Sequence, residues 1–370
     1  MNKLKIAVFG HKSIPSRCGG VEIAVQQFAV RMAALGHEVT CYNRGGGKKT
    51  ALWEGVRLKT VPTLPGKGLA AVSASIFAAF AVAFSDADLC HIHAEGPAMM
   101  SFLPKLFGKR VIVTVHGLDW QREKWRGTPG ARYIRMGEKI AVRFADEIIV
   151  LNRDTQDYFR EVYGRQTRFI PNGVEIPRIL PPERIKAYGL KGDDYILYLG
   201  RLVPEKGIHD LIRAYRGISV DKKLVIAGAP SDTEDYASQL RTLAAGDDRI
   251  LFTDFVEGRL LEELYSNAFA YVLPSHLEGM PLSLLEAMSY GNCCVISRIP
   301  GCTDAAGDHA ITFPAGDVAA LRDALERLCG DDTLRQHYRS CARAHVRSCP
   351  GWDEITHRTL ELYHESITDS

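Results

Sequence analysis

The chain has 370 residues, more than a single hydrophobic core usually holds, so two domains are expected. With 46% hydrophobic and 24% charged residues, it has the composition of an ordinary soluble globular protein. Its nine cysteines are odd in number and form no C-x2-C pair, which argues against a disulfide framework or a zinc site and predicts reduced thiols in the cytoplasm.

Charge is unevenly distributed along the chain, although the net charge is only +2. Residues 1–180 hold 26 Lys and Arg against 15 Asp and Glu, so the first half is basic and the second is acidic. A basic half favours an anionic partner. A phospholipid surface or a lipid-phosphate acceptor fits better than nucleic acid, because no basic recognition helix or aromatic stacking motif accompanies the charge.

The N-terminal stretch predicts a βαβ opening, with a strand over 4–10, a helix over 21–36 and a second strand over 37–44. The first apolar run is too short for an export signal. The loop before the helix ends in Gly19 and Gly20, where backbone amides can approach a phosphate closely. A simple turn is the alternative, because the G-x-G-x-x-G fingerprint is absent.

A helix over 69–84 and a strand ending near His93 are expected next. The helical segment is uncharged but shorter than the ~20 residues that cross a bilayer, so it predicts a buried helix. Asp86 and Asp88 form a D-x-D pair, yet they precede the strand and lie at the wrong end for a ligand crevice. His91 and His93 alternate on one strand face as packed or hydrogen-bonded residues. No metal site is therefore predicted.

A strong strand then leads into His116, at the carboxyl end where α/β enzymes place reacting or orienting groups. A structural histidine is the alternative.

Residues 121–144 interleave cations with aromatic and apolar side chains. This pattern favours contact with acidic headgroups or with the phosphate of a lipid-linked acceptor; a solvated helical face is the alternative. The cations are Arg122, Lys124, Arg126, Arg132, Arg135, Lys139 and Arg143.

The Pro-rich residues 176–184 predict a linker, after which a second α/β run begins. Its first strand delivers Arg201, and Lys206 follows at the start of a helix. Two cations at a strand-to-helix junction suit a diphosphate, because Arg binds oxygens in a bidentate manner and Lys acts as a point charge.

The stretch from Ser275 to Gly291 places two carboxylates, Glu278 and Glu286, around the start of a helix. The apolar run before it predicts a buried parallel strand, so Glu278 lies at a strand-loop-helix junction, where α/β sheets bind ligands. Amides at a helix N-terminus attract anions, and carboxylates accept from hydroxyls, which together suit a nucleotide sugar. The residues expected at this junction are Gly279, Met280, Pro281 and Leu282, with Pro281 in the first helical turn.

These motifs, in this order, resemble the retaining glycosyltransferases of family 4: the Gly-Gly loop, His116, the Arg201 and Lys206 pair, and Glu278 and Glu286 with seven residues between them. The stretch IPSRCGGVE resembles the subgroup that makes bacterial surface polysaccharides and includes rhamnosyltransferases, although Cys18 departs from that pattern. The resemblance implies an α/β chain of GT-B fold. Two Rossmann-like domains would face each other across a donor cleft, with a C-terminal helix crossing back to the first.

The resemblance also assigns roles. It implies that Glu278 meets the donor sugar, that Glu286 meets the ribose, and that His116 contacts the sugar near the leaving group. The groups implied at the diphosphate are Gly19, Gly20, Arg201 and Lys206, and those beside the base are Phe255 and Val256. The expected domains are residues 1–175 for the acceptor, 183–350 for the nucleotide sugar, and 351–370 as the returning helix.

The implied reaction moves a sugar from a nucleotide-diphosphate donor to a hydroxyl of a lipid-linked or polysaccharide acceptor, with retention at the anomeric carbon. The donor is a UDP- or TDP-sugar, with TDP-rhamnose suggested by the subgroup. No cofactor is predicted, because cations and helix amides can stabilise the departing diphosphate. A cytoplasmic enzyme in peripheral contact with the anionic inner face of the plasma membrane is expected. A GT-B sugar-nucleotide epimerase and a non-catalytic binding subunit are the alternatives.

Overall fold

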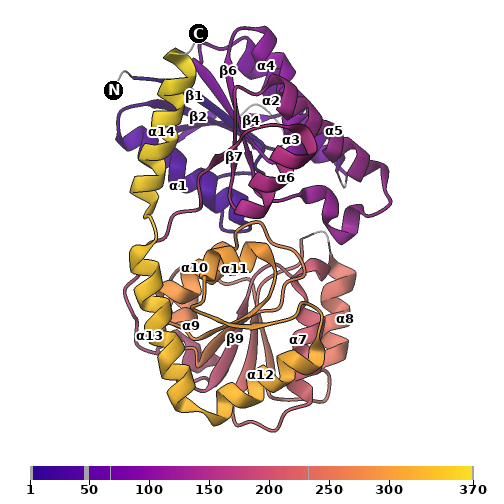
Figure 1. Cartoon of the computed structure of the whole chain (residues 1–370), viewed down its shortest axis with the longest axis vertical. Helices are drawn as coiled ribbons and strands as arrows, with labels where there is room; N and C mark the ends of the chain where they lie inside the picture. Colours follow the sequence, from indigo (N-terminus) through magenta and orange to yellow (C-terminus); the bar gives the residue numbers. More distant parts are fainter. Residues whose placement is uncertain (1–2, 46–49, 67, 232, 369–370) are drawn as a thin grey trace. The chain divides into compact units, whose positions relative to one another are not determined.

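The computed structural model describes residues 3–45, 50–66, 68–231 and 233–368. The chain divides into two compact units, one of Met1–Gly173 with Gly351–Ser370 and the other of Val174–Pro350. Each unit is a largely parallel sheet covered by helices (Figure 1). The prediction of two Rossmann-like α/β domains is confirmed.

The described part of the first unit contains a sheet of order β3-β4-β2-β1-β5-β6-β7-β8, in which only β3 pairs antiparallel. The connections reverse direction between β1 and β5, so the loops after these two strands diverge and leave room for a ligand. The strands are β1 (Lys5–Phe9), β2 (Glu38–Arg44), β3 (Thr50–Trp53), β4 (Val56–Val61), β5 (Leu89–His93), β6 (Arg110–Val115), β7 (Glu147–Val150) and β8 (Arg168–Phe169).

Helices cover both faces of this sheet, because alternate residues of each central strand point to opposite cores. Ala7 and Phe9 belong to one core, with residues of α2, α3, α5 and α6; Ile6 and Val8 belong to the other, with residues of α1 and α14. The helices are α1 (Gly20–Ala34), α2 (Leu69–Ala83), α3 (Glu95–Ala98), α4 (Phe102–Leu106), η1 (Asp119–Gln121), η2 (Glu123–Trp125), α5 (Pro129–Phe144), α6 (Arg153–Tyr163) and α14 (Trp352–Thr368).

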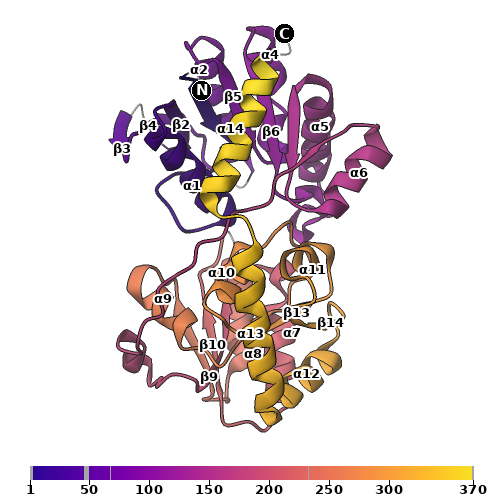
Figure 2. The same ribbon diagram turned by 60° about the vertical axis from the view of Figure 1, so that its left-hand side comes forward.

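The last helix, α14, completes the first unit although it comes from the end of the chain. It lies against α1 and β6 (Figure 2). Tyr363 and Ile355 are fully buried, and the ring of Trp352 packs edge-on against Phe28 with centroids 5.4 Å apart. Burial of this apolar stripe stabilises the unit by about 1.5–3 kcal/mol for each large side chain.

The expectation that residues 69–84 form a buried helix is wrong for one face of α2. Ala74 and Val82 pack against the sheet, but Phe80 is 49% exposed and Phe84, just after the helix, is 72% exposed. A uniformly apolar sequence cannot show which side of a helix meets the sheet. Here the small alanines allow close packing, and the larger aromatic rings face outward.

In the second unit the described strands form a parallel sheet of order β11-β10-β9-β12-β13-β14, the order of dinucleotide-binding folds. The connections reverse between β9 and β12, which therefore flank the expected ligand crevice. The strands are β9 (Tyr195–Leu199), β10 (Lys223–Ala227), β11 (Ile250–Asp254), β12 (Ala270–Leu273), β13 (Cys294–Ser297) and β14 (Ile311–Phe313).

The helices of the second unit pack in groups, with α7 against α8 and α12, and α10 against α11 and α13. The helix α10 starts at Leu282, so Pro281 lies just before its first turn. The sequence alone predicted Pro281 inside that turn. The helices are η3 (Arg184–Tyr188), η4 (Pro204–Lys206), α7 (Ile208–Arg216), α8 (Glu234–Ala244), α9 (Gly258–Ser266), α10 (Leu282–Ser289), α11 (Pro300–Ala306), α12 (Val318–Gly330) and α13 (Asp332–Ser348).

Candidate active site

Lys206 and Glu278 form an ion pair at the point where the sheet of the second unit reverses. Lys206 follows β9 and Glu278 follows β12, and their Nζ and Oε1 atoms lie 2.5 Å apart. Only 13% of the lysine side chain and 9% of the glutamate side chain are exposed. The hydroxyl of the fully buried Ser275 donates to the same Oε1 at 2.6 Å. Two donors therefore fix one carboxylate oxygen of Glu278.

Two glycines allow the backbone around this pair to pack closely. Gly207 has φ +64°, and a Cβ there would lie 2.0 Å from the carbonyl oxygen of Pro274. A Cβ on Gly301, at the start of α11, would lie 2.3 Å from the carbonyl oxygen of Glu278. Any larger residue at either position would push the loop that carries Glu278 away from its neighbours.

Glu286 lies one helical segment further along, inside α10. Its Oε2 accepts from the hydroxyl of Tyr265 at 3.1 Å, and the ring of Tyr265 stacks on Tyr290 with centroids 5.2 Å apart. Tyr265 is almost fully buried. The Tyr265 hydroxyl, held by the stacked Tyr265 and Tyr290 rings, therefore orients the carboxylate of Glu286. An oriented carboxylate suits a group that accepts hydrogen bonds from ligand hydroxyls.

The remaining residues predicted in the second unit also follow carboxyl ends of its strands. Arg201 comes after β9, and its backbone carbonyl accepts from the Tyr198 hydroxyl at 3.0 Å. Phe255 and Val256 come after β11; Phe255 is 43% exposed, whereas Val256 is buried. Gly279, Met280 and Pro281 connect Glu278 to α10, which begins at Leu282. Because all strands are parallel, these segments emerge at one edge of the sheet.

In the first unit, the loops after β1 and β5 meet through a glycine. Gly10 has φ +111°, and a Cβ there would lie 2.1 Å from the carbonyl oxygen of His93. Gly19 precedes α1 and Gly20 is its first residue. The Glu22 side chain folds back over this turn, where its Oε1 accepts from the amide of Lys12 at 2.8 Å. A carboxylate thus occupies the space above the predicted phosphate-binding turn.

His116 is held by a second histidine. Its Nε2 lies 2.9 Å from Nδ1 of His93, so one of the two nitrogens donates to the other. Burial lowers the pKa of His116 to about 4 and the pKa of His93 well below its usual value, because charged imidazole is poorly solvated there. Both rings are neutral at pH 7, and His116 can hydrogen-bond a hydroxyl without carrying charge.

His91 also belongs to this buried group. Its ring nitrogens contact the hydroxyls of Thr114 at 2.7 Å and of Tyr363 in α14 at 2.5 Å. The ring centroids of His91 and His93 are 4.1 Å apart. Both are packed, hydrogen-bonded strand residues, and His93 connects His91 to His116.

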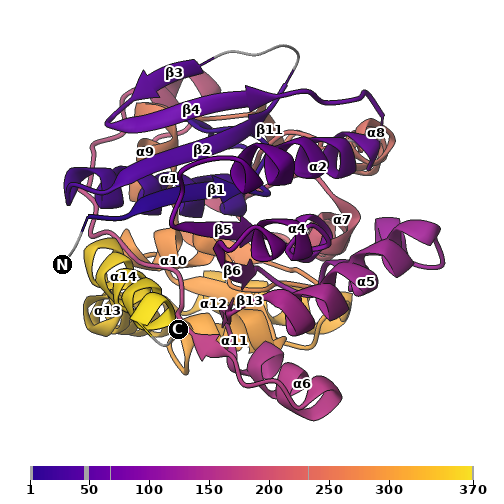
Figure 3. The ribbon, with the colours of Figure 1, turned by 90° about the horizontal axis from the view of Figure 1, so that it is seen from above.

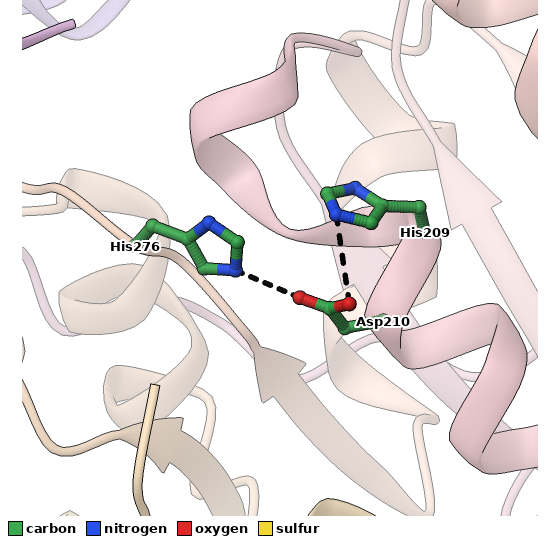
Figure 4. A group of neighbouring side chains, drawn as sticks. All are labelled: His209, Asp210 and His276. Atoms are coloured by element: carbon green, nitrogen blue, oxygen red, sulfur yellow. Dashed lines mark hydrogen bonds and ion pairs between the residues drawn. The ribbon is translucent and has the colours of Figure 1, made fainter. Parts of the chain in front are cut away.

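Some functional candidates were missed from the sequence. Ser275 was given no role from the sequence, although its hydroxyl donates to the carboxylate three residues later. His209, Asp210 and His276 come together in the second unit (Figure 4). His209 and Asp210 are adjacent, but His276 lies 66 residues after Asp210, so no local motif joins the three.

Among the described helices, none combines the length and apolar character that crossing a bilayer requires.

Comparisons with known proteins agree with this architecture. Residues 18–178 match the family model described as Glycosyltransferase Family 4, and residues 182–345 match the model described as Glycosyl transferases group 1. The D-inositol 3-phosphate glycosyltransferase of Acidothermus cellulolyticus is 26% identical over 392 residues, covering 95% of this chain and 86% of that protein.

Two solved structures share the fold. Sucrose-phosphate synthase from Thermosynechococcus elongatus has a TM-score of 0.85 at 22% identity and covers 100% of both chains. Anabaena HepE, solved with UDP-glucose, has a TM-score of 0.80 at 17% identity and covers 98% of this chain and 100% of its own. The two Rossmann-like units therefore define a glycosyltransferase of the GT-B fold. The two matched models span most of the chain, and the protein belongs to glycosyltransferase family 4.

Proposed function

We propose that the protein moves a sugar from a nucleotide-diphosphate donor to an acceptor hydroxyl, with retention at the anomeric carbon. The Lys206–Glu278 pair carries this proposal. It puts a cation and a carboxylate together at the reversal point of the second sheet, directly before the N-terminus of α10. The cation and the helix amides suit a diphosphate, and the carboxylate suits the hydroxyls of a sugar.

The contacts around Glu278 suggest how the site works. Lys206 and Ser275 both bind Oε1, so Oε2 is the oxygen that we assign to a hydroxyl of the donor sugar. A bound diphosphate would draw the lysine Nζ from Glu278 toward its own oxygens. As the bond to the anomeric carbon breaks, negative charge grows on the diphosphate, and Lys206, Arg201 and the α10 amides would stabilise it there.

The other roles are proposed on the family resemblance together with position in each unit. Glu286, oriented by Tyr265, would accept from the ribose hydroxyls. Phe255, with its half-exposed ring, and Val256 would contact the base. In the first unit, His116 would hydrogen-bond the donor sugar as a neutral imidazole, and the Gly19-Gly20 turn would accept the diphosphate after Glu22 moves aside.

Relatives support a nucleotide-sugar donor. Anabaena HepE was solved with UDP-glucose, and a starch synthase IV catalytic domain from Arabidopsis thaliana was solved with ADP and acarbose. We propose a UDP- or TDP-sugar for this chain, with TDP-rhamnose as the first candidate from the subgroup resemblance. No observation favours the epimerase or the non-catalytic subunit.

Donor turnover tests this proposal. The purified protein is incubated with EDTA and a panel of UDP-, TDP- and GDP-sugars, with and without lipid-linked acceptors, and release of nucleoside diphosphate is measured. Glu278→Gln should lower release by about 10² or more, because the sugar loses its orienting carboxylate. Glu262→Gln, an exposed change in α9, is the matched control. Donor binding without release under every condition would refute transfer.

A surface of the first unit supports a lipid-linked acceptor. The helix α4 contacts both α2 and α5, and the three lie side by side (Figure 3). Phe84 and Leu106 are 72% and 70% exposed, and the Phe84 ring packs edge-on against Phe107 with centroids 4.8 Å apart. On α5 the exposed cations include Arg132, Arg135, Lys139 and Arg143. Apolar side chains next to a basic helix suit an anionic membrane.

Vesicle binding tests this surface. Phe84→Ser with Leu106→Ser should weaken binding to anionic vesicles about tenfold or more, since each large apolar side chain is worth about 1.5–3 kcal/mol when buried. Replacing Arg132, Arg135 and Lys139 by Ala should weaken it too and reduce its salt dependence. Leu52→Ser, at a site 77% exposed on β3, is the control. Equal binding by all variants would remove the membrane from the proposal.

A further inference from the structure

Three side chains with metal-ligand chemistry converge in the two segments that carry Lys206 and Glu278. His209 and Asp210 lie in the first turn of α7, and His276 lies in the loop after β12. One ligand atom from each lies within 4.8 Å of the others. The two imidazoles flank the carboxylate from opposite sides (Figure 4). No role in the proposed transfer uses this cluster.

The cluster is held in place by contacts outside it. The amide of His276 donates to the carbonyl of Glu205 at 2.8 Å, which ties its loop to η4, just before α7. The side chain of Asp210 is only 9% exposed. Nδ1 of His209 lies 2.8 Å from the Tyr236 hydroxyl, so its Nε2 is the nitrogen directed at Asp210. An outer hydrogen bond of this kind orients metal-binding histidines.

The ligand atoms lie close enough together for one ion to gather them after a small rearrangement. Zinc binds nitrogen and oxygen at about 2.0–2.1 Å, so its ligand atoms lie about 3.3 Å from one another. Nε2 of His209 is 3.5 Å from Oδ1 of Asp210, and Nε2 of His276 is 2.7 Å from Oδ2. The two imidazoles meet different oxygens of the carboxylate, and one ligand atom from each residue lies within 4.8 Å of the others. Binding one ion therefore requires the half-exposed His276 ring to move so that all three ligand atoms reach tetrahedral spacing.

The ligand chemistry selects the class of ion. Two imidazoles and one carboxylate suit Zn²⁺, Co²⁺ or Ni²⁺, whereas Ca²⁺ and Mg²⁺ prefer oxygen ligands. Arg213 is the competing cation: its Nη1 lies 3.6 Å from Oδ1 of Asp210, beyond hydrogen-bond distance. Its side chain is 56% exposed and can turn toward water when an ion binds.

We propose that His209, Asp210 and His276 bind a transition-metal ion of the Zn²⁺ class, with a fourth position open to water. The ion joins the start of α7 to the loop that carries Glu278, and so restrains the two segments on either side of the Lys206–Glu278 pair. It takes no part in bond breaking. The site rests on its own geometry and does not depend on the proposed transfer activity.

Metal binding to the tag-free, EDTA-stripped full chain tests the site. Zn²⁺ uptake is measured by calorimetry and equilibrium dialysis, and Co²⁺ is used as a spectroscopic probe of a tetrahedral site. We expect one ion per chain, and a thermal midpoint that rises with Zn²⁺ and returns with EDTA. Tyr236→Phe should weaken uptake by about 10–100-fold, as loss of an outer partner does. His209→Ala or His276→Ala should weaken it by at least as much.

His357→Ala, which removes an exposed histidine of α14, is the matched control and should bind like the parent chain. Circular dichroism of each variant shows that it is folded. The proposal is overturned if the parent chain takes up no stoichiometric ion, or if uptake survives both His209→Ala and His276→Ala. If His209→Ala and His276→Ala lose Zn²⁺ uptake but keep their donor turnover in EDTA, the metal site is supported and the transferase proposal is unaffected.

Discussion

Ser275→Ala tests whether the buried hydroxyl positions the carboxylate of Glu278. The variant removes one of the two donors to Oε1, at a site where Ser275 is 0% exposed and water cannot replace it. A hydrogen bond to a charged group is worth about 1.5–3 kcal/mol, which corresponds to a rate loss of about 10- to 150-fold if the interaction is needed in the transition state. We expect the loss mainly in kcat, because the buried hydroxyl acts through the carboxylate of Glu278.

The assay is steady-state release of nucleoside diphosphate, with kcat and KM measured separately, together with a thermal unfolding curve. Ser297→Ala is the matched control, since the hydroxyl of that equally buried serine in β13 has no hydrogen-bond partner in the described structure. It should leave kcat unchanged. If Ser275→Ala changes kcat by less than twofold while folding normally, the hydroxyl does not position Glu278.

Three further predictions follow from other contacts. Lys206→Met should lower diphosphate release by about 10²–10³ in EDTA, the cost of losing one preorganised charge, and a near-normal rate would exclude Lys206 from the site. Gly301→Ala should reduce activity far more than Gly330→Ala, because a Cβ at the first meets the Glu278 carbonyl at 2.3 Å and one at the second meets nothing within 4 Å; equal activities would contradict this. Burial lowers the pKa of His91 to about 3. Below about pH 6.5 the unfolded state therefore binds more protons than the folded state. The free energy of unfolding then falls by about 1.4 kcal/mol per pH unit as the pH drops toward the folded pKa. His91→Gln should flatten the fall in denaturation midpoint between pH 7.5 and 5, whereas His357→Gln, at an exposed site, should not; parallel curves would show that His91 does not titrate as its burial requires.

The α/β class and the second-domain motifs were accessible from local patterns. Short apolar runs, most of them followed by a loop and a helix, predict parallel strands whose carboxyl ends share one edge. Lys206 and Glu278 could therefore be assigned to that edge from their places after two strands. Their direct contact could not be predicted, because they lie 72 residues apart and no sequence pattern shows which strands are neighbours.

The outward face of α2 and the His209, Asp210 and His276 cluster show the same limit. Residues 69–84 are so uniformly apolar that the sequence does not show which face of the helix is buried. In the structure the alanine face packs against the sheet. His276 reaches Asp210 across 66 residues of sequence, through the close backbone approach at Gly207. The sequence by itself determined the element types, the two-domain organisation and the residues at strand ends. Strand order, helix faces and the partners of each buried polar group were decided by tertiary packing, because these depend on long-range contacts that local periodicity does not encode.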